Sequence, residues 1–246
     1  LEPFFISNEQ DLSISYLPYQ AGLASMKLKQ GADAMNWNVR EVPKWFKYKK
    51  NSEGTWQSTR QSMTETYIPR ALAAGCQLLA QTQIIQIKAD KQRGKYALAR
   101  VLDQSGRLES MKIHFNTVFV CGGTIQTPTL LRRSGIKRNI GNTLKMHLMV
   151  KFIARFKQRV NTEAMEIPVH QVKEFAPQLS FGCSISSLPY LALGLLNQPD
   201  DNSKILQSWP HLAIYYVSSI GTSSGTVRSL PFFVDPLVRY PVTNQD

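Results

Sequence analysis

The chain has 246 residues, of which 43% are hydrophobic and 19% are charged, a composition typical of a globular protein with a buried core. Basic residues outnumber acidic residues 29 to 17, and the resulting net charge of +12 is compatible with binding to an acidic partner. No apolar run approaches the ~20 residues that a membrane-spanning helix requires, and the cysteine and histidine spacing argues against a structural zinc site.

The cysteines and the amino terminus bear on the compartment. We interpret Cys76, Cys121 and Cys183 as free, buried thiols, which favours a reducing and therefore cytoplasmic compartment. No signal-peptide pattern opens the chain. The first residue is Leu1 rather than a methionine, so we expect the natural amino terminus to lie further upstream.

The first fifty residues predict one strand and one helix. Leu12–Tyr16 alternates apolar and polar residues like a short strand, and Ala21–Ala34 has the apolar spacing of a helix. Asn36–Lys50 is rich in Trp, Lys and Pro, and we expect it to be irregular. Its lysines beside Trp45 have the composition of a single-stranded nucleic-acid contact, but an exposed, solvated loop is the simpler interpretation.

A helix is predicted from Ser62 to Gly75. Ser62 followed by Glu65 fits a capping box, and Gly75 fits the left-handed residue that ends many helices. Pro69 lies inside this span and predicts a kink or a restart of the helix. Beyond it, residues 78–87 read as a strand, and residues 95–115 read as a hairpin closed by a turn over 103–106.

A stretch in the middle of the chain carries the most specific pattern. Val118–Cys121 is a short apolar run, which predicts a strand buried on both faces as in a parallel sheet. Gly122 and Gly123 follow at once. Thr127 fits a helix cap with Pro128 at the first helical position. Strand, glycine pair and capped helix resemble the end of a dinucleotide-fold crossover, where the chain passes close to a ligand.

The last third of the chain has the pattern of an antiparallel sheet. Leu212–Ile220 is predicted to pair with Gly225–Arg228 across the tight turn between them. Further strands are expected at residues 150–156 and near Val238. The apolar stretch 168–196 is expected to be rich in loops.

Residues 123–136, GTIQTPTLLRRSGI, resemble the second characteristic motif of the glucose–methanol–choline (GMC) oxidoreductases. That motif reads roughly Gly-small-x-x-Thr-Pro-x-Leu-Leu-x-x-Ser-Gly-Ile-Gly, and only its last glycine is replaced here, by Lys137. Residues 140–147 are similar to the family's Gly-x-x-Leu-x-x-His-Pro, with Leu148 in place of proline. The segment 34–37 resembles its Leu-Gly-Trp, with Asn36 in place of glycine.

The resemblance implies FAD as the cofactor and oxidation of an alcohol by hydride transfer to the flavin. It also implies which residues line the cofactor: Ile84, Cys121, Gly122, Gly123 and Thr127. No Gly-x-Gly-x-x-Gly follows a first strand, and no segment matches the family's catalytic histidine motif. We therefore expect no catalytic residue within the chain, His147 included, and place the catalytic residues downstream of Asp246.

These observations predict an internal fragment of an FAD-dependent oxidoreductase acting on CH–OH groups, of mixed α+β and α/β class. Part of an FAD-binding dinucleotide fold is assigned to residues 1–148, with a helical substrate-domain insert near 20–60. Part of an antiparallel-sheet substrate domain is assigned to residues 149–246. We expect a small-molecule alcohol as substrate, neither nucleic acid, membrane nor metal as partner, and no activity from these residues alone.

The alternative is a non-enzymatic basic protein that keeps the fold and binds an acidic partner. Because phosphate-rich partners release counterions on binding, this alternative predicts tight association that weakens steeply with salt.

Overall fold

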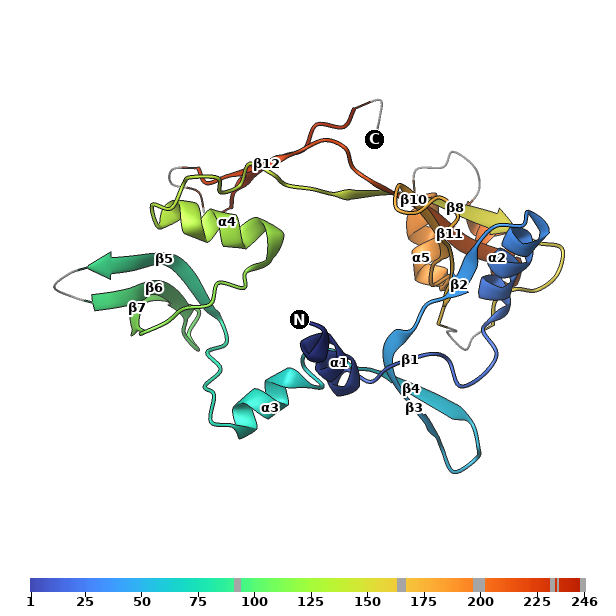
Figure 1. Cartoon of the computed structure of the whole chain (residues 1–246), viewed down its shortest axis with the longest axis horizontal. Coiled ribbons are helices and arrows are strands. Elements are labelled where there is room, and N and C mark those ends of the chain that lie inside the picture. The colour runs from blue at the N-terminus through green and yellow to red at the C-terminus, as the bar shows by residue number, and fades with distance from the viewer. Residues whose placement is uncertain (91–93, 163–166, 197–201, 231–232, 234, 244–246) are drawn as a thin grey trace. The chain divides into compact units, whose positions relative to one another are not determined.

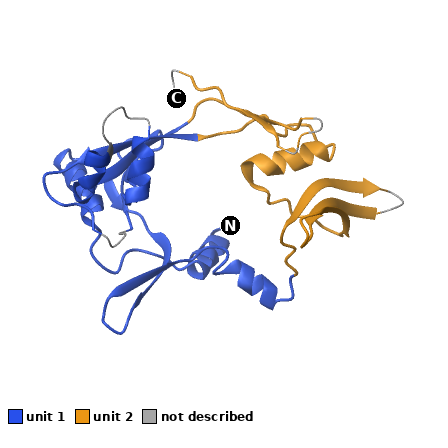
Figure 2. Ribbon diagram, turned by 180° about the vertical axis from the view of Figure 1, so that it is seen from behind, with its two compact units in different colours: residues 1–76, 147–220 blue, residues 77–146, 221–246 orange. Residues whose placement is uncertain are grey.

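The computed structural model describes residues 1–90, 94–162, 167–196, 202–230, 233 and 235–243. The protein is mixed α and β, and within these residues every strand pair is antiparallel. Two compact units are built from alternating segments (Figure 2): unit 1 from residues 1–76 and 147–220, and unit 2 from residues 77–146 and 221–246. The mixed class and the antiparallel sheets agree with the prediction. The parallel sheet expected around Val118–Cys121 is not seen, because the described residues contain no parallel strand pair.

A five-stranded sheet forms the centre of unit 1 (Figure 1). Its strands lie in the order β2 (Val39–Glu41), β9 (His170–Val172), β10 (Leu179–Cys183), β11 (Leu212–Ile220) and β8 (His147–Arg155). The longest pair, β8 with β11, keeps one register along its length, with Ile153 opposite Ile214. Branched and aromatic residues suit these strands because their side chains pack well on a pleated surface.

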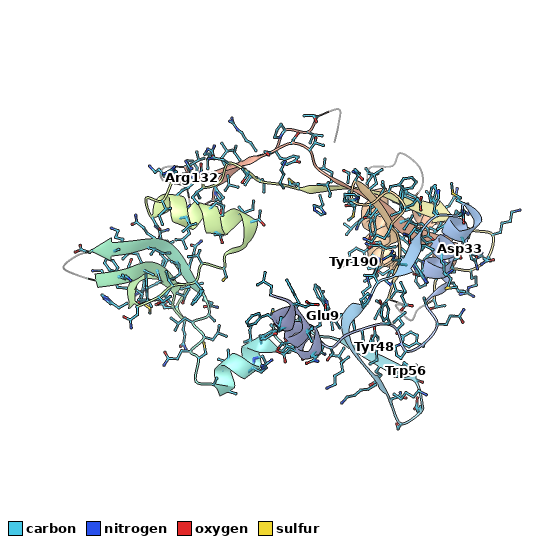
Figure 3. The ribbon with its side chains drawn as sticks, viewed as in Figure 1. Glu9, Asp33, Tyr48, Trp56, Arg132 and Tyr190 are labelled. Carbon is cyan, nitrogen blue, oxygen red and sulfur yellow. The ribbon has the colours of Figure 1, made fainter. Side chains whose placement is uncertain are left out.

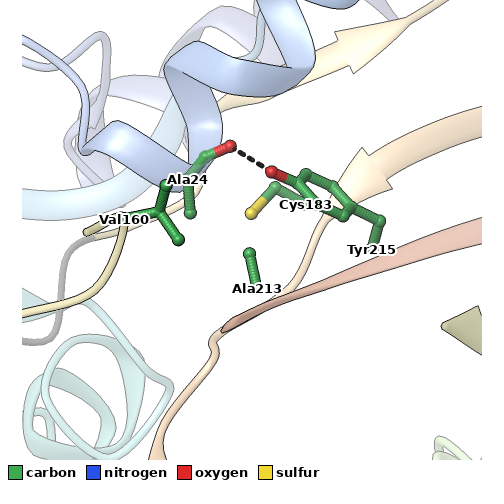
Figure 4. Packing of buried hydrophobic residues seen from close by; sticks show 5 residues of the cluster. All are labelled: Ala24, Val160, Cys183, Ala213 and Tyr215. Carbon is green, nitrogen blue, oxygen red and sulfur yellow. Dashed lines mark hydrogen bonds between the residues drawn. The ribbon is translucent and has the colours of Figure 1, made fainter. Parts of the chain in front are cut away.

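Helices cover both faces of this sheet. On one face α2 (Leu23–Ala34) contributes to a buried cluster shown in Figure 4: Ala24, Val160, Cys183, Ala213 and Tyr215. The Tyr215 hydroxyl donates to the Ala24 carbonyl oxygen at 2.8 Å, and burial raises the pKa of that hydroxyl. On the opposite face α5 (Leu188–Leu195) and α6 (Asn202–Gln207) pack over a second cluster: Leu191, Leu212 and Ile214, with Ile153, Ile205, Leu206 and Trp209 around them.

The end of α2 explains one departure from the family pattern. Asn36 has φ +57°, and the Trp37 N–H reaches back to the Ala32 carbonyl at 2.9 Å. This is a left-handed helix terminus, for which asparagine is the usual substitute for glycine. The predicted helix over residues 21–34 is confirmed. Asn36 adopts the left-handed backbone conformation that the family's glycine would adopt at this position.

A second, three-stranded sheet of unit 1 corrects the prediction for Asn36–Lys50. Its order is β1 (Ile14–Ser15), β3 (Lys44–Lys50) and β4 (Trp56–Arg60). The expected irregular loop is wrong because β4 supplies a hydrogen-bonding partner for all but the first two residues of β3, with Tyr48 opposite Ser58. Figure 3 labels Tyr48 and Trp56 on this hairpin. The remaining elements of unit 1 are α1 (Glu2–Asp11), α3 (Tyr67–Ala73) and the 3₁₀ helix Trp209–His211.

Helix α3 is shorter than predicted at its start and ends where expected. The Ser62 hydroxyl bonds to the Thr64 hydroxyl at 2.6 Å, so the predicted capping box is absent. Pro69 is the third helical residue, where its missing N–H removes no hydrogen bond of the helix. Gly75 has φ +88°, and the next amide, of Cys76, donates to the Ala71 carbonyl at 2.9 Å, which confirms the predicted left-handed end.

Unit 2 contains the predicted hairpin within a three-stranded sheet. Its strands are β5 (Thr82–Asp90), β6 (Gly94–Leu102) and β7 (Leu108–His114), in that order. In the β6–β7 turn the Asp103 carboxylate accepts the backbone N–H groups of Ser105 and Arg107 at 2.9 and 2.7 Å, and these bonds lower the pKa of Asp103. The expected turn over 103–106 is confirmed.

The remaining elements of unit 2 are α4 (Gly123–Arg133), β12 (Thr226–Arg228) and β13 (Leu237–Arg239). β12 pairs with β13, whereas β11 pairs with β8 and β10, so the predicted β11–β12 hairpin is wrong. The assignment of residues 1–148 to the FAD-binding domain and 149–246 to the substrate domain stays a prediction. The expected insert at residues 20–60 lies in unit 1 together with residues 147–220.

Candidate functional site

The segment between β7 and α4 does not form the strand predicted for Val118–Cys121. Residues 117–122 have no regular structure, and Phe119 is 86% exposed. The physical reason is that a buried parallel strand needs hydrogen-bonding neighbours, and no strand among the described residues pairs with this segment. The apolar run is present without the sheet that would bury it.

Helix α4 begins one turn earlier than predicted. Gly122 is its N-cap and Gly123 its first residue, so Thr127 is an interior residue rather than the cap. Pro128 therefore lies inside the helix, where it cannot donate to the carbonyl one turn back. The helix continues past it to Arg133, and the fully buried Thr129 hydroxyl donates to the Ile125 carbonyl at 2.7 Å.

Two side chains fasten α4 to β5. The Gln86 amide donates to the Arg133 carbonyl at 2.7 Å, and the Ile87 N–H donates to the Ser134 hydroxyl at 2.8 Å. Ser134 in turn donates to the Leu130 carbonyl at 2.7 Å. The helix is thus held at its carboxyl end, while its amino end begins at the Gly122–Gly123 pair.

A cavity of about 460 Å³ lies between this helix, the sheet and the 117–122 segment. Its walls come from β5, β6, β7, the exposed segment and α4: Thr82, Gln83, Ile84, Ile87, Ala97, Ile113, Phe115, Val118–Gly122, Gln126, Leu130 and Arg133. Most of the lining is apolar, and a few amide and guanidinium groups are placed among the hydrophobic side chains. That combination is typical of sites for organic ligands and cofactors.

A β-bulge shapes the sheet wall of this cavity. The register of β5 against β6 shifts between Ile84 and Gln86, so that Ile84 lies opposite Ala99 and Ile87 opposite Ala97. Cross-strand partners share a face, and Ala97 and Ala99 are two residues apart. The bulge therefore brings Ile84 and Ile87, three residues apart, to the same face, which is the known effect of one extra residue in a strand.

The structure brings together three of the five predicted cofactor-lining residues. Ile84, Cys121 and Gly122 all line the cavity, whereas Gly123 and Thr127 do not. A side chain at Gly122 would stand 3.2 Å from the Thr127 nitrogen, so the start of the helix packs closely there. Gly123 has φ +76°, which favours glycine, and beyond its chain neighbours and its own helix no described protein atom lies within 4 Å of the position that a side chain would take there.

Sequence reasoning missed other lining residues, chiefly Gln83, Phe119, Gln126 and Arg133. Gln126 is one helical turn before Leu130, so the 3.6-residue period of a helix starting at Gly123 signals both. Phe119 was assigned to a buried strand, which hid its place at the cavity wall. His147 opens β8 in unit 1 and does not line this cavity.

None of the three cysteines forms a disulfide, and of the three predicted to be buried only one is buried. Cys183 lies in the core beside Tyr215, whereas Cys76 and Cys121 are exposed. Within the described residues no group of three or more His, Cys, Asp or Glu side chains could hold a metal ion. None of the described helices is long and apolar enough to cross a membrane.

The comparisons with known proteins agree with the family resemblance of the motif. The sequence profile of the GMC oxidoreductases matches residues 1–149, and the chain belongs to this family. A relative described as an uncharacterized GMC-type oxidoreductase, y4nJ, of Sinorhizobium fredii strain NGR234 is 29% identical over 250 residues. That alignment covers 100% of this chain and 50% of the relative, so the chain spans about half the length of the curated relative it matches.

Proposed function

We propose that this chain forms part of an FAD-dependent oxidoreductase that oxidises an alcohol, and that the cavity of unit 2 holds part of the flavin cofactor. Family membership over residues 1–149 supports an oxidoreductase. The proposal rests on the position of the family motif beside the cavity. Gln126 of the motif and the two residues just before the motif, Cys121 and Gly122, all line the cavity.

The residues present fit a flavin nucleotide. The first N–H groups of α4 have no intrahelical partner, and its N-cap residue Gly122 supplies no side-chain cap for them. Gly122 and Gln126 belong to this first turn and also line the cavity, so the uncapped turn adjoins it. Uncapped helix amino termini bind oxygen-rich and anionic groups, and the apolar wall with Ile84 and Leu130 suits a planar ring system.

When bound, FAD supplies the two-electron acceptor that alcohol oxidation requires. The chain's own residues then bind and orient the cofactor. Ile84 and Ile87 present a flat sheet face, Gly122 keeps the first turn of α4 close to the cavity, and Gln83 and Gln126 offer hydrogen bonds. The apolar lining excludes water from this part of the site. We place the base that accepts the hydroxyl proton downstream of Asp246, so no residue of this chain moves a proton.

The remaining expectations belong to the same proposal. The substrate is a small-molecule alcohol, the dinucleotide fold is completed by residues outside those described, and the protein functions in the cytoplasm without nucleic acid or membrane. The fold prediction rests on the apolar segment 117–121, which lacks strand neighbours among the described residues.

The test uses the complete protein, purified and folded. We expect a flavin absorbance spectrum, loss of that absorbance when an alcohol is added without oxygen, and turnover with a dye acceptor. A folded but colourless protein would contradict the proposal. If that colourless protein instead bound polyanions with a steep salt dependence, the non-enzymatic alternative would be favoured.

A further inference from the structure

A second hollow, of about 500 Å³, lies in unit 1 beside the β1–β3–β4 sheet. It shares no residue with the cavity of unit 2. We call it the basic-aromatic hollow and define it by the residues on which the argument rests: Ile14, Lys44, Trp45, Phe46, Arg60 and Ile185.

Two cations lie in its lining without a carboxylate partner. Within the described part of the chain, the ion pairs are Lys29–Asp33 and Arg70–Asp11, so neither Lys44 nor Arg60 is neutralised. Lys44 is partly buried, and desolvation lowers the pKa of its ammonium group without any opposing charge nearby. A partly desolvated cation with no counter-charge is a costly arrangement that an anion would relieve.

Apolar and aromatic groups surround these cations. The Arg60 guanidinium lies 5.4 Å from the centre of the Trp45 ring, a cation–π arrangement that holds the planar group against the indole. The Gln61 N–H donates to the Trp45 carbonyl at 2.9 Å, which fixes the end of β4 beside β3. Ile14 and Ile185 add apolar side chains to the lining.

We propose that the basic-aromatic hollow binds a small organic anion, with its carboxylate or phosphate head on Lys44 and Arg60 and its aromatic or alkyl body against Trp45 and Ile185. Arg60 supplies a planar fork that matches such a head, and Lys44 supplies a point charge. The apolar wall favours an anion with a hydrophobic body over an inorganic ion. This inference does not depend on the flavin proposal, because the two hollows lie in different units.

The experiment is a titration of the complete protein at low ionic strength with four probes that share a phenyl ring. The probes are 3-phenylpropanoate, 2-phenylethylphosphonate, the neutral 3-phenylpropanol and the cationic 3-phenylpropylamine, and binding is followed by calorimetry. We expect at least one of the two anions to bind about tenfold more tightly than the alcohol, since two partly exposed ion pairs are worth about that factor. The two anionic probes distinguish a carboxylate from a phosphate ligand.

Variants show whether the preference comes from these residues. Lys44→Met and Arg60→Gln should each reduce the preference for the anion, and Lys44→Arg should retain it. Lys49→Met is the matched control, because Lys49 lies on the same strand but does not line the basic-aromatic hollow. The proposal is overturned if neither anion binds better than the alcohol, if the preference survives in both variants, or if Lys49→Met reduces it equally. Lys44 is partly buried, so Lys44→Met could fail to fold. Arg60 is exposed, so Arg60→Gln should fold and still tests the proposal.

Discussion

The Ser25 hydroxyl oxygen lies 3.0 Å from His170 Nδ1, joining α2 to β9 across 145 residues of sequence. The same oxygen accepts the backbone N–H groups of Val169 and His170 at 3.2 and 3.1 Å. Because two N–H groups already donate to this oxygen, its own proton is available to Nδ1 in the tautomer that carries the ring proton on Nε2. Both side chains are buried, so this one hydroxyl satisfies three groups in the core of unit 1.

Replacing Ser25 with alanine should destabilise the protein by about 1–3 kcal/mol, because two buried N–H groups and one ring nitrogen lose their partner. The measurement is the urea midpoint of unfolding compared with the wild-type protein. Ser58→Ala, at an exposed position of β4, is the control and should change the midpoint little. Equal midpoints for Ser25→Ala and the wild type would show that water or a rearrangement replaces the hydroxyl.

Stability should fall as the pH drops below about 6.5. Burial lowers the pKa of His170 below its ordinary value of 6.5, with the added effect of Lys29, and Glu41, a hydrogen bond to the Ser25 backbone and Asp33 oppose this shift. The unfolded chain then binds a proton that the folded chain resists, so unfolding is favoured on acidification between the unfolded and the folded pKa. Well above pH 6.5 His170 is neutral in both the folded and the unfolded chain, so this loss of stability is absent.

The check is a series of urea unfolding curves from pH 7.5 down to about pH 5. His170→Asn removes the titrating group and should flatten this part of the profile, whereas His147→Asn, at an exposed position, should keep the wild-type slope. A slope that persists unchanged in His170→Asn would assign the effect to other groups.

Gly141 lies so close to Val227 that any side chain at this position should destabilise unit 2. Gly141 has φ +72°, its carbonyl accepts the Val227 N–H at 2.9 Å, and a side chain at Gly141 would overlap the Val227 carbonyl oxygen. Gly106 has a similar φ of +78° but open space around it. Gly141→Ala therefore adds a steric clash, worth about 1–3 kcal/mol, to the backbone strain that both variants share.

Hydrogen exchange separates the two effects locally. In Gly141→Ala the amide of Val227 should exchange faster, because its acceptor is displaced, whereas in Gly106→Ala it should exchange as in the wild type. Equal protection of Val227 in both variants would mean that the two segments can move apart without losing the bond.

Local signals in the sequence predicted part of this structure well. The helix over 21–34, the glycine end at Gly75 and the turn over 103–106 depend on neighbouring residues, and each is confirmed. The strand at Val118–Cys121 and the pairing of β11 with β12 depend on distant segments, and both predictions were wrong. An apolar run or a tight turn does not show which strand will be its partner.

The candidate site also combines features that the sequence predicts with features that depend on strand pairing. The family resemblance implied Cys121 and Gly122, which line the cavity as part of one continuous segment. The sequence does not show that a β-bulge turns Ile84 and Ile87 to the same face of the sheet, because the bulge arises from the register between β5 and β6. For Gly123 the structure adds a local requirement, a positive φ that favours glycine, and its predicted approach to the cofactor stays a prediction.

Replacing Gly123 with valine should reduce the flavin content of the complete protein. A branched residue at φ +76° strains the first residue of α4, and the helix start would shift relative to Gly122 at the cavity wall. Gly106→Val imposes the same strain at φ +78° in a turn that does not line the cavity. The ratio of flavin to protein absorbance is the measurement, and equal ratios in the two folded variants would argue against a cofactor role for this helix start.

The 246 residues expressed alone should neither retain FAD nor oxidise alcohols. Phosphate binding in dinucleotide folds uses backbone N–H groups at a glycine-rich turn after a strand, and no Gly-x-Gly-x-x-Gly occurs in this sequence. The apolar segment 117–121 lacks strand partners among the described residues, and Val118 and Phe119 are 42% and 86% exposed. Such exposed apolar surface promotes association, so we also expect aggregation of the isolated chain.

Phe119→Ser provides a matched test of that expectation. Removing the single aromatic ring of the 117–121 segment should raise the soluble fraction of the isolated chain, whereas Phe233→Ser, at a 66% exposed position outside that segment, should raise it less. The soluble material is then examined for flavin absorbance and assayed with alcohols and a dye acceptor. A yellow, active preparation would show that these 246 residues already contain the cofactor cradle and the proton acceptor that we place outside them.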